Sequence, residues 1–127
     1  MRCLCLLAAT MMVSIGVIAH TDPLRTLTTA EAKNHIGERA TVCGVVESGR
    51  YSTSGRQPTF LNLDKAYPNQ PFTVLIWAAN REKFGKPEET YKGKRICVTG
   101  TIESYQNAPE IVLDDPRDLT VQGDKKR

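Results

Sequence analysis

The strongest constraint on the fold is a series of short segments rich in β-branched and apolar residues. These segments are residues 40–47, 59–63, 72–79, 95–103 and 109–113, and each has the length and composition of a β-strand. The stretches between them are polar and contain Gly, Pro and Asn, which favour turns. Five strands within about seventy-five residues predict a small, mostly β barrel or sandwich.

The residues before the first strand carry the signals of a short helix. Thr28 is suited to cap the amino end of a helix over residues 27–37, and Glu31 three positions later completes a capping box. Gly37 is suited to the left-handed position that ends a helix. Residues 119–121 predict one further short segment after the last strand.

The amino-terminal residues resemble a secretion signal. Met1–Arg2 is a short positive start, residues 3–19 are uncharged and mostly apolar, and a small residue, Ala19, precedes polar sequence. This pattern predicts a signal peptide over residues 1–19 that is cleaved on export. An uncleaved membrane anchor is the alternative, whereas Cys3 and Cys5 precede the apolar run and so do not fit a lipoprotein cysteine.

A repeated motif links two of the predicted strands. The pattern Val-x-Gly-x-Val/Ile occurs at residues 42–46 and again at 98–102, so its alternate residues share one face of each strand. A glycine inside a strand marks a bend or bulge, as a tightly curved barrel requires. Cys43 and Cys97 fall on the opposite face, and an even pair in an exported chain predicts a disulfide. Two buried reduced thiols are the alternative.

The charge balance permits several kinds of partner. The 127 residues carry a formal net charge of +3, and loss of residues 1–19 leaves 16 basic against 14 acidic side chains, a charge of +2. This weak excess allows a polyanionic partner without arguing for one. His20 and His35 are isolated and the chain has no Cys-x-x-Cys, so neither a metal site nor a cofactor is predicted.

Four stretches of the chain resemble a known family. They are residues 31–46, with Glu-Ala-x-x-His-Ile-Gly at their start, and residues 58–63, 67–74 and 91–100. They are similar to small exported bacterial OB-fold proteins, a family described as nucleic-acid-binding domains of the tRNA-anticodon-binding kind. The resemblance covers roughly residues 28–116 and implies a five-stranded Greek-key OB-fold barrel with a short N-terminal helix.

The residue patterns and the resemblance together predict a domain organisation and a location. The signal peptide of residues 1–19 is followed by a linker over 20–27, an OB-fold domain over 28–121 and a basic tail over 122–127. The mature protein is expected to be periplasmic or secreted.

An OB-fold usually binds its ligand on the outer face of its second and third strands, flanked by loops. Single-stranded nucleic acid needs aromatic rings for stacking and cations for its backbone. In strand 59–63, Leu61 and Leu63 are expected to point inward, which leaves Phe60 and Asn62 outward. The candidate nucleic-acid-binding residues are Arg50, Tyr51, Arg56, Phe60, Asn62, Lys65, Tyr67, Trp77, Arg81 and Lys83.

Each of these candidates has a structural alternative. Trp77, the only tryptophan, is equally suited to fill the core. Arg50, Tyr51 and Arg56 are read as belonging to a polar loop that needs no ligand. Basic residues crowd segment 81–95, and such a run is often ordinary solvated surface.

The leading hypothesis is a non-enzymatic, exported domain that binds nucleic acid. The alternative is a periplasmic module that binds a protein or small ligand through the same face. A metal-dependent nuclease built on Asp114, Asp115 and Asp118 is a third possibility, although no accompanying general base is apparent.

Overall fold

A computed structural model of the chain describes residues 9–17 and 23–123. Residues 9–17 are exposed and have no regular secondary structure. The signal-peptide prediction also involves residues 1–8 and 18–19, and the basic-tail prediction involves residues 124–127, all of which lie outside the described residues. Within the described ranges, no helix has the length and apolar character needed to span a membrane.

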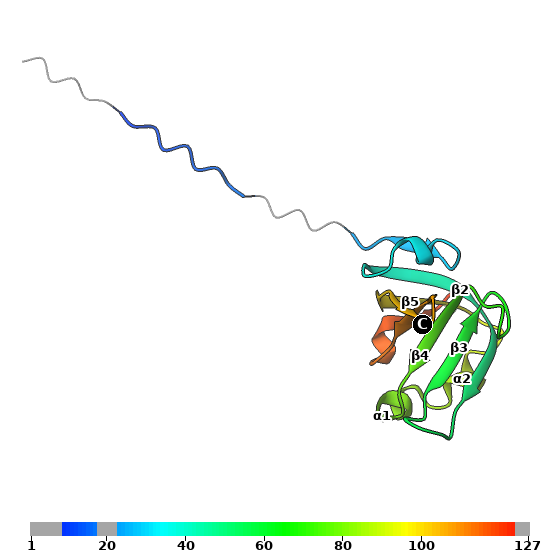
Figure 1. The fold of residues 1–127 in the computed structure, drawn as a ribbon. Coiled ribbons are helices and arrows are strands. Elements are labelled where there is room, and N and C mark those ends of the chain that lie inside the picture. The colour runs from blue at the N-terminus through cyan, green and yellow to red at the C-terminus, as the bar shows by residue number, and fades with distance from the viewer. Residues whose placement is uncertain (1–8, 18–22, 124–127) are drawn as a thin grey trace, which may run out of the picture.

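The domain is built from β-strands with a few short helical turns (Figure 1). Five strands correspond to the predicted segments, and they are β2 (Arg39–Tyr51), β3 (Thr59–Leu63), β4 (Phe72–Ile76), β5 (Arg95–Thr101) and β7 (Ala108–Val112). Three short strands are added, namely β1 (Thr26–Thr28), β6 (Glu103–Tyr105) and β8 (Leu119–Val121). The helical elements are α1 (Ala78–Arg81), α2 (Pro87–Thr90), η1 (Ala32–Asn34), η2 (Glu82–Phe84) and η3 (Pro116–Asp118).

The long strand β2 belongs to both halves of the sheet. Its first part pairs antiparallel with β5, and its last part pairs antiparallel with β3. The register shifts between Val46 and Ser48, which is a β-bulge at Glu47. Because a bulge adds one residue, odd-numbered side chains face outward before it and even-numbered side chains face outward after it. The full order is β6-β7-β4-β3-β2-β5-β8, with β1 beside β2 and with β4 parallel to β7.

The alternate residues of the Val-x-Gly-x-Val/Ile motif share one face of each strand, as predicted, and this face belongs to the core. Val42, Val46, Val98 and Ile102 are all fully buried. At Gly100, a Cβ would lie 2.8 Å from Cγ2 of Ile111 on β7, so this position requires glycine for close packing of the two strands.

The predicted disulfide between Cys43 and Cys97 is present. The two residues are directly opposite each other on β2 and β5, with their Cα atoms 4.1 Å apart. The hydroxyls of Thr41 and Thr99, the next outward pair, lie 2.8 Å apart and share a hydrogen bond. The motif places both cysteines on the face opposite its valines, and the antiparallel register, in which Val42 pairs with Val98, brings them directly opposite each other.

The predicted closed five-stranded barrel is wrong. The described strands form an eight-stranded open mixed sheet, without a hydrogen-bonded ladder between β5 and β7. The backbone of Ile102 instead donates to Glu38 and accepts from Gly37, both in the connection before β2. The edge of β5 before this point is paired with β8, so the backbone groups that would close a barrel already have other partners.

The predicted helix over residues 27–37 is also wrong. Thr26–Thr28 forms β1, parallel to β2, and only the single turn η1 follows. The capping box itself forms, because the Thr28 amide donates to Glu31 and the Glu31 amide donates to the Thr28 hydroxyl. Leu27 is buried where β1 pairs with β2, which favours the strand over the helix. The β-branched residues on either side of it, Thr26 and Thr28, also favour the strand.

Two strand boundaries differ from the prediction. Arg50 and Tyr51 were expected in a loop, but β2 continues through Tyr51, which is paired with Thr59. The strand predicted over 72–79 ends at Ile76, and Trp77 immediately precedes α1. Periodicity alone did not reveal either boundary, because both depend on pairing with a neighbouring strand.

Candidate functional site

A row of polar side chains crosses the outer face of the sheet. Ser48, Asn62, Thr73 and Glu110 are register partners on β2, β3, β4 and β7, so they share this face. The Asn62 amide donates to the Ser48 hydroxyl at 3.0 Å, and the Thr73 hydroxyl donates to the Asn62 oxygen at 3.4 Å. We call these four residues the polar row. Two hydrogen bonds therefore join Ser48, Asn62 and Thr73, and they satisfy the polar groups of Asn62 and Thr73, which are buried.

A second row on the same face is mostly apolar. Arg50, Phe60, Leu75 and Val112 are register partners on the same four strands. The guanidinium carbon of Arg50 lies 5.7 Å from the centroid of the Phe60 ring, within the range of a cation–π contact. The row therefore places one cation and one aromatic ring side by side at the β2 edge of the face.

The polar row and part of the apolar row form the floor of a groove of about 590 Å³, which we call the main groove. Two exposed tyrosines line it: Tyr67, 73% exposed, lies in the β3–β4 connection, and Tyr105, 58% exposed, is the last residue of β6. Gln106 and Asn107 both have positive φ and make the tight turn that follows Tyr105. The remaining lining residues are Ser48, Gly49, Arg50, Phe60, Asn62, Pro68, Gln70, Thr73, Gln106, Ala108, Pro109 and Glu110.

The carboxylate of Glu110 gives this groove an acidic side. Glu110 is directly opposite Glu103 on β6. Partial burial raises the pKa of Glu110 above the ordinary glutamate value, and the negative charge of Glu103 raises it further. Arg50 and Glu110 therefore give opposite charges to the β2 and β7 sides of the groove.

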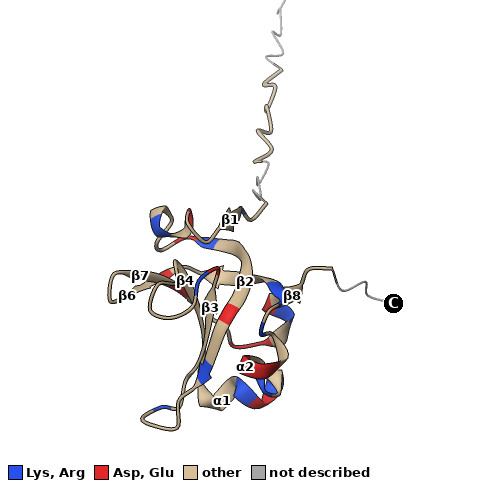
Figure 2. Cartoon of the chain, turned by 90° about the vertical axis from the view of Figure 1, so that its right-hand side faces the viewer, with Lys and Arg blue, Asp and Glu red and all other residues tan. Residues whose placement is uncertain are grey.

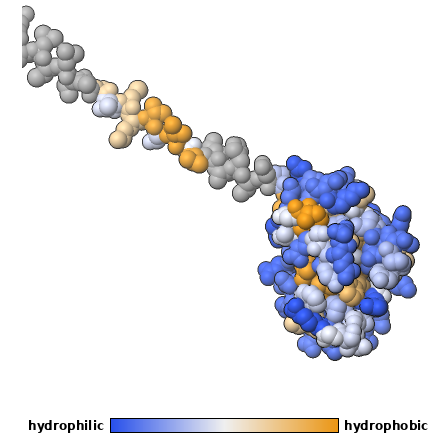
Figure 3. Space-filling model, viewed as in Figure 1, coloured by the Kyte–Doolittle hydropathy of each residue, from blue (hydrophilic) through white to orange (hydrophobic). Residues whose placement is uncertain are grey.

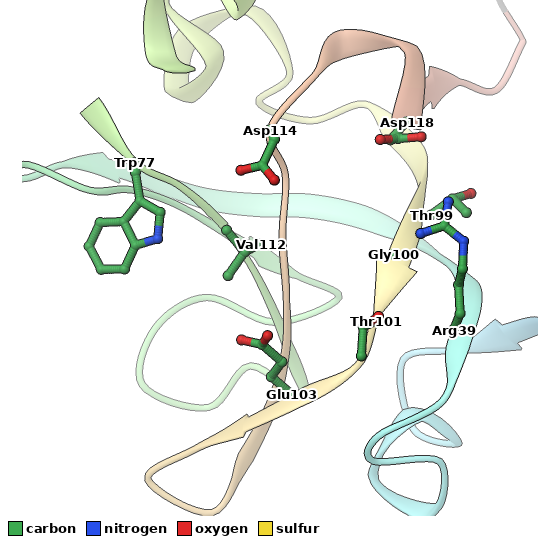
Figure 4. Close-up of a pocket in the computed structure, with 9 residues that line it drawn as sticks. All are labelled: Arg39, Trp77, Thr99, Gly100, Thr101, Glu103, Val112, Asp114 and Asp118. Carbon is green, nitrogen blue, oxygen red and sulfur yellow. The ribbon is translucent and has the colours of Figure 1, made fainter. Parts of the chain in front are cut away.

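A smaller hollow of about 430 Å³ lies where β5 and β7 are not hydrogen-bonded (Figure 4). It is lined by three acidic residues, Glu103, Asp114 and Asp118, and by Arg39, so we call it the acidic hollow. In Figure 4, Glu103 and Asp114 lie on either side of Val112. The remaining lining residues are Trp77, Thr99, Gly100 and Thr101.

The aspartates considered for a nuclease site have local structural partners. The Asp115 carboxylate accepts from the Arg117 amide at the start of η3, and this hydrogen bond lowers the pKa of Asp115. Asp114 accepts from the Asn80 side chain. In the part of the chain that the structure describes, no group of three or more His, Cys, Asp or Glu residues is arranged to hold a metal ion.

Four of the ten predicted binding residues line the main groove, namely Arg50, Phe60, Asn62 and Tyr67. They come from β2, β3 and the β3–β4 connection. Asn62 lies outward as expected, yet it is only 4% exposed because Ser48 and Thr73 pack beside it. It therefore acts as part of the floor.

Four other predicted residues contact one another away from the main groove. The guanidinium carbon of Arg81 lies 3.9 Å from the centroid of the Tyr51 ring, and Arg81 forms an ion pair with Glu88 of α2. The guanidinium carbon of Arg56 lies 4.3 Å from the centroid of the Trp77 ring. These contacts join the β2–β3 hairpin tip to the segment after β4, and Trp77 is partly buried under Arg56.

The last two predicted residues lie elsewhere on the surface. Lys83 donates to the backbone carbonyl of Asp114, and Lys65 is exposed in the β3–β4 connection outside the groove lining. Figure 2 shows basic and acidic residues interspersed along the ribbon around α1 and α2. The crowded basic segment 81–95 therefore does not form a surface of one sign.

Several groove residues were missed by the sequence reasoning. Tyr105 and Glu110 belong to strands whose pairing was not predicted, and Ser48 lay in a predicted loop. The sequence did contain a signal for this pairing. Two short segments, 103–105 and 108–110, are separated by the two residues Gln106 and Asn107, a spacing that is typical of a β-hairpin.

The hydropathy of the molecular surface agrees with a solvent-exposed groove. On the side seen in Figure 3, the domain is predominantly hydrophilic and the hydrophobic areas are small. The larger exposed apolar residues of the domain include Tyr67 and Tyr105, which both belong to the groove. Exposed aromatic rings beside a hollow are typical of binding surfaces.

No protein-family model matches the sequence, and no curated protein matches it. Among solved structures, the chain is similar to a protein described as an aspartyl-tRNA synthetase from Leishmania major. The TM-score is 0.56 and the identity 11%, and the match covers 87% of this chain but only 23% of that one. The chain therefore spans less than a quarter of that protein's length.

The chain is also similar to two OBodies that were solved bound to hen egg-white lysozyme. Their TM-scores are 0.56 and 0.53, with identities of 19% and 17%. Each match covers 81% of this chain, and it covers 96% of the first OBody and 97% of the second. Together with the sheet topology, these similarities define the class of the domain, which is an OB-like fold.

Proposed function

We propose that the protein binds single-stranded nucleic acid in the main groove. The observation that carries this proposal is the combination of two exposed tyrosines, Tyr67 and Tyr105, with the Arg50–Phe60 pair beside a polar floor. Bases stack on aromatic rings, while a cation attracts the phosphate backbone. Unpaired bases have free faces for stacking, which favours single strands over duplex.

The proposal includes an exported protein without enzymatic activity. The Cys43–Cys97 disulfide supports export, because disulfides persist mainly in oxidising compartments. The apolar segment of residues 3–19 supports a signal peptide. The weak net charge predicts modest affinity with limited salt dependence, since few phosphates are neutralised.

The test is fluorescence anisotropy of labelled single-stranded DNA and RNA with residues 20–127 in the disulfide-bonded form. Binding should be detectable at low salt and should weaken as salt rises, because counterions are released on binding. Arg50→Ala should weaken binding and reduce the salt dependence. Arg117→Ala is the matched control, since the Arg117 side chain is 80% exposed and lies on η3, outside the groove lining.

A protein partner is the second candidate, and the acidic side of the groove favours it. Glu103 and Glu110 repel phosphates but would attract the basic side chains of a protein. The two OBodies bound to lysozyme are consistent with protein recognition by this fold. Absence of oligonucleotide binding at low salt would favour this candidate over nucleic acid.

A further inference from the structure

The glutamates on β6 and β7 are an unexpected feature of a surface that binds polyanions. Glu103 and Glu110 are cross-strand partners, and like charges directly opposite each other destabilise a sheet. None of the ion pairs between described residues involves either side chain. The repulsion between these two carboxylates is an energetic cost to the sheet, which suggests a purpose other than stability.

The position of Glu110 suggests that purpose. It continues the polar row, so its carboxylate is at the β7 side of the same floor as Asn62 and Thr73. Arg50 is on β2, three strand spacings from β7, and it is offset from the row of Glu110 by two residues along the strands, so the two positions are about 16 Å apart. A nucleotide in the groove therefore meets a cation on one side and a carboxylate on the other.

This charge separation orients a bound strand. The phosphates are attracted to the Arg50 side and repelled from the Glu110 side, so the bases extend over the floor toward β7. An ionised carboxylate has only hydrogen-bond acceptors, so it pairs with N–H groups of a base and is repelled by carbonyl oxygens. Acceptance from the cytosine amino group is a recognised role of glutamate in base recognition.

We infer that Glu110 selects single strands whose bases carry an exocyclic amino group, above all cytosine, and discriminates against thymine and uracil. The inference rests on the proposed function. Thymine and uracil have a carbonyl oxygen where cytosine has its amino group, so they would place an acceptor against the carboxylate. Glu103 strengthens the effect by adding negative charge beside Glu110.

The experiment compares labelled oligo(dC) and oligo(dT) of equal length at pH 7.5, using wild-type residues 20–127 and the Glu110→Gln variant. The two oligonucleotides are both pyrimidine strands with the same backbone, so phosphate attraction to the protein is matched. The wild type should bind oligo(dC) about tenfold more tightly than oligo(dT). Glu110→Gln should lose most of that ratio, because an amide both donates and accepts.

Glu89→Gln is the matched control, because it removes the same charge from an exposed position on α2. It should leave the ratio unchanged while altering both affinities equally. Equal wild-type affinities for the two strands, or an unchanged ratio in Glu110→Gln, would overturn the inference and leave the proposed function standing. Failure of both strands to bind at low salt would overturn both.

Discussion

The two halves of β2 differ in what holds them and in what they expose. Residues 39–45 pair with β5, carry the disulfide and lie beside β1, and we call this the locked half. Residues 48–51 pair with β3 and carry Ser48 and Arg50 on the groove face, and we call this the groove half. The bulge at Glu47 separates them.

This difference indicates a division of β2 into a half that contributes stability and a half that contributes binding. The covalent bond in the locked half constrains the chain at residues that do not line the groove. The groove half is then free to carry polar and aromatic side chains that contribute less to packing. If the division holds, substitutions in the locked half should alter stability and substitutions in the groove half should alter binding.

The largest effect is expected from removing the disulfide. The double substitution Cys43→Ser/Cys97→Ser opens a loop with a sequence separation of 54 and should lower the free energy of unfolding by about 4 kcal/mol, by chain entropy. Urea denaturation of oxidised wild type and the variant measures the difference. Oligonucleotide affinity, measured well below the unfolding transition, should be unchanged, and a large loss of affinity would contradict the division between the halves.

A smaller loss of stability is expected at the contact between β5 and β7. Gly100→Ala places a methyl group 2.8 Å from Ile111 Cγ2 in the buried core, which should cost about 1–3 kcal/mol through overpacking. Thermal unfolding checks this. Ile111→Ala removes the Cγ2 atom that the new methyl group would meet. Gly100→Ala should therefore lower stability less in the Ile111→Ala background than in the wild type. An equal loss in both backgrounds would indicate another cause.

Tyr67 and Tyr105 lie outside β2 and line the same groove as the groove half, so they should affect binding without affecting stability. Tyr67→Ala and Tyr105→Ala should each weaken single-strand binding by about 1–2 kcal/mol, because each removes one stacking surface. Both side chains are mostly exposed, so the unfolding midpoint should remain within error of the wild type. Ile36→Ala, at a 45% exposed apolar residue outside the groove lining, serves as the control. Equal loss in the control would argue against stacking.

The smallest effect concerns Glu110 and pH. The folded-state pKa of Glu110 is raised, so the protein is relatively more stable below the ordinary glutamate pKa and loses that stability as pH rises through the raised value. Glu110→Gln removes this loss and should stabilise the protein by about 0.2–1 kcal/mol at pH 7. Urea denaturation of the wild type and the variant at pH 7 and pH 4 tests the sign of this pH dependence. The stability advantage of Glu110→Gln over the wild type should be smaller at pH 4.

The elements that sequence reasoning predicted well depend on local patterns. The Val-x-Gly-x-Val/Ile repeat showed which residues of β2 and β5 share a face, and the even number of cysteines on the opposite face predicted the Cys43–Cys97 disulfide that the structure contains. The capping box at Thr28 and Glu31 also formed, because it joins residues three positions apart. The helix expected around it did not, since pairing of β1 with β2 and burial of Leu27 outweighed a single cap.

The candidate site was only partly accessible to the same reasoning. Phe60 and Tyr67 were found because aromatic residues on a predicted strand face and its loop are visible in the sequence. Tyr105 and Glu110 were missed because they lie far from β3 in the sequence. They line the groove only because β7 pairs with β4 and β6 pairs with β7. Trp77 and Arg81 were predicted as binding residues because of their residue types. Their contacts with Arg56 and Tyr51 arise from tertiary packing, which the sequence pattern did not reveal.

Local patterns in the sequence were enough to predict the strand-rich class of the domain, the positions of its main strands along the chain and the cysteine pair, since alternation and turn residues act over a few positions. The open sheet, the bulge of β2 at Glu47 and the cation and carboxylate on opposite sides of one groove follow instead from strand pairing. Each backbone hydrogen-bonding group has to find a partner, and that partner can lie far away in the sequence. Gly37 and Glu38 became the partners of Ile102, a choice that depends on contacts between distant segments.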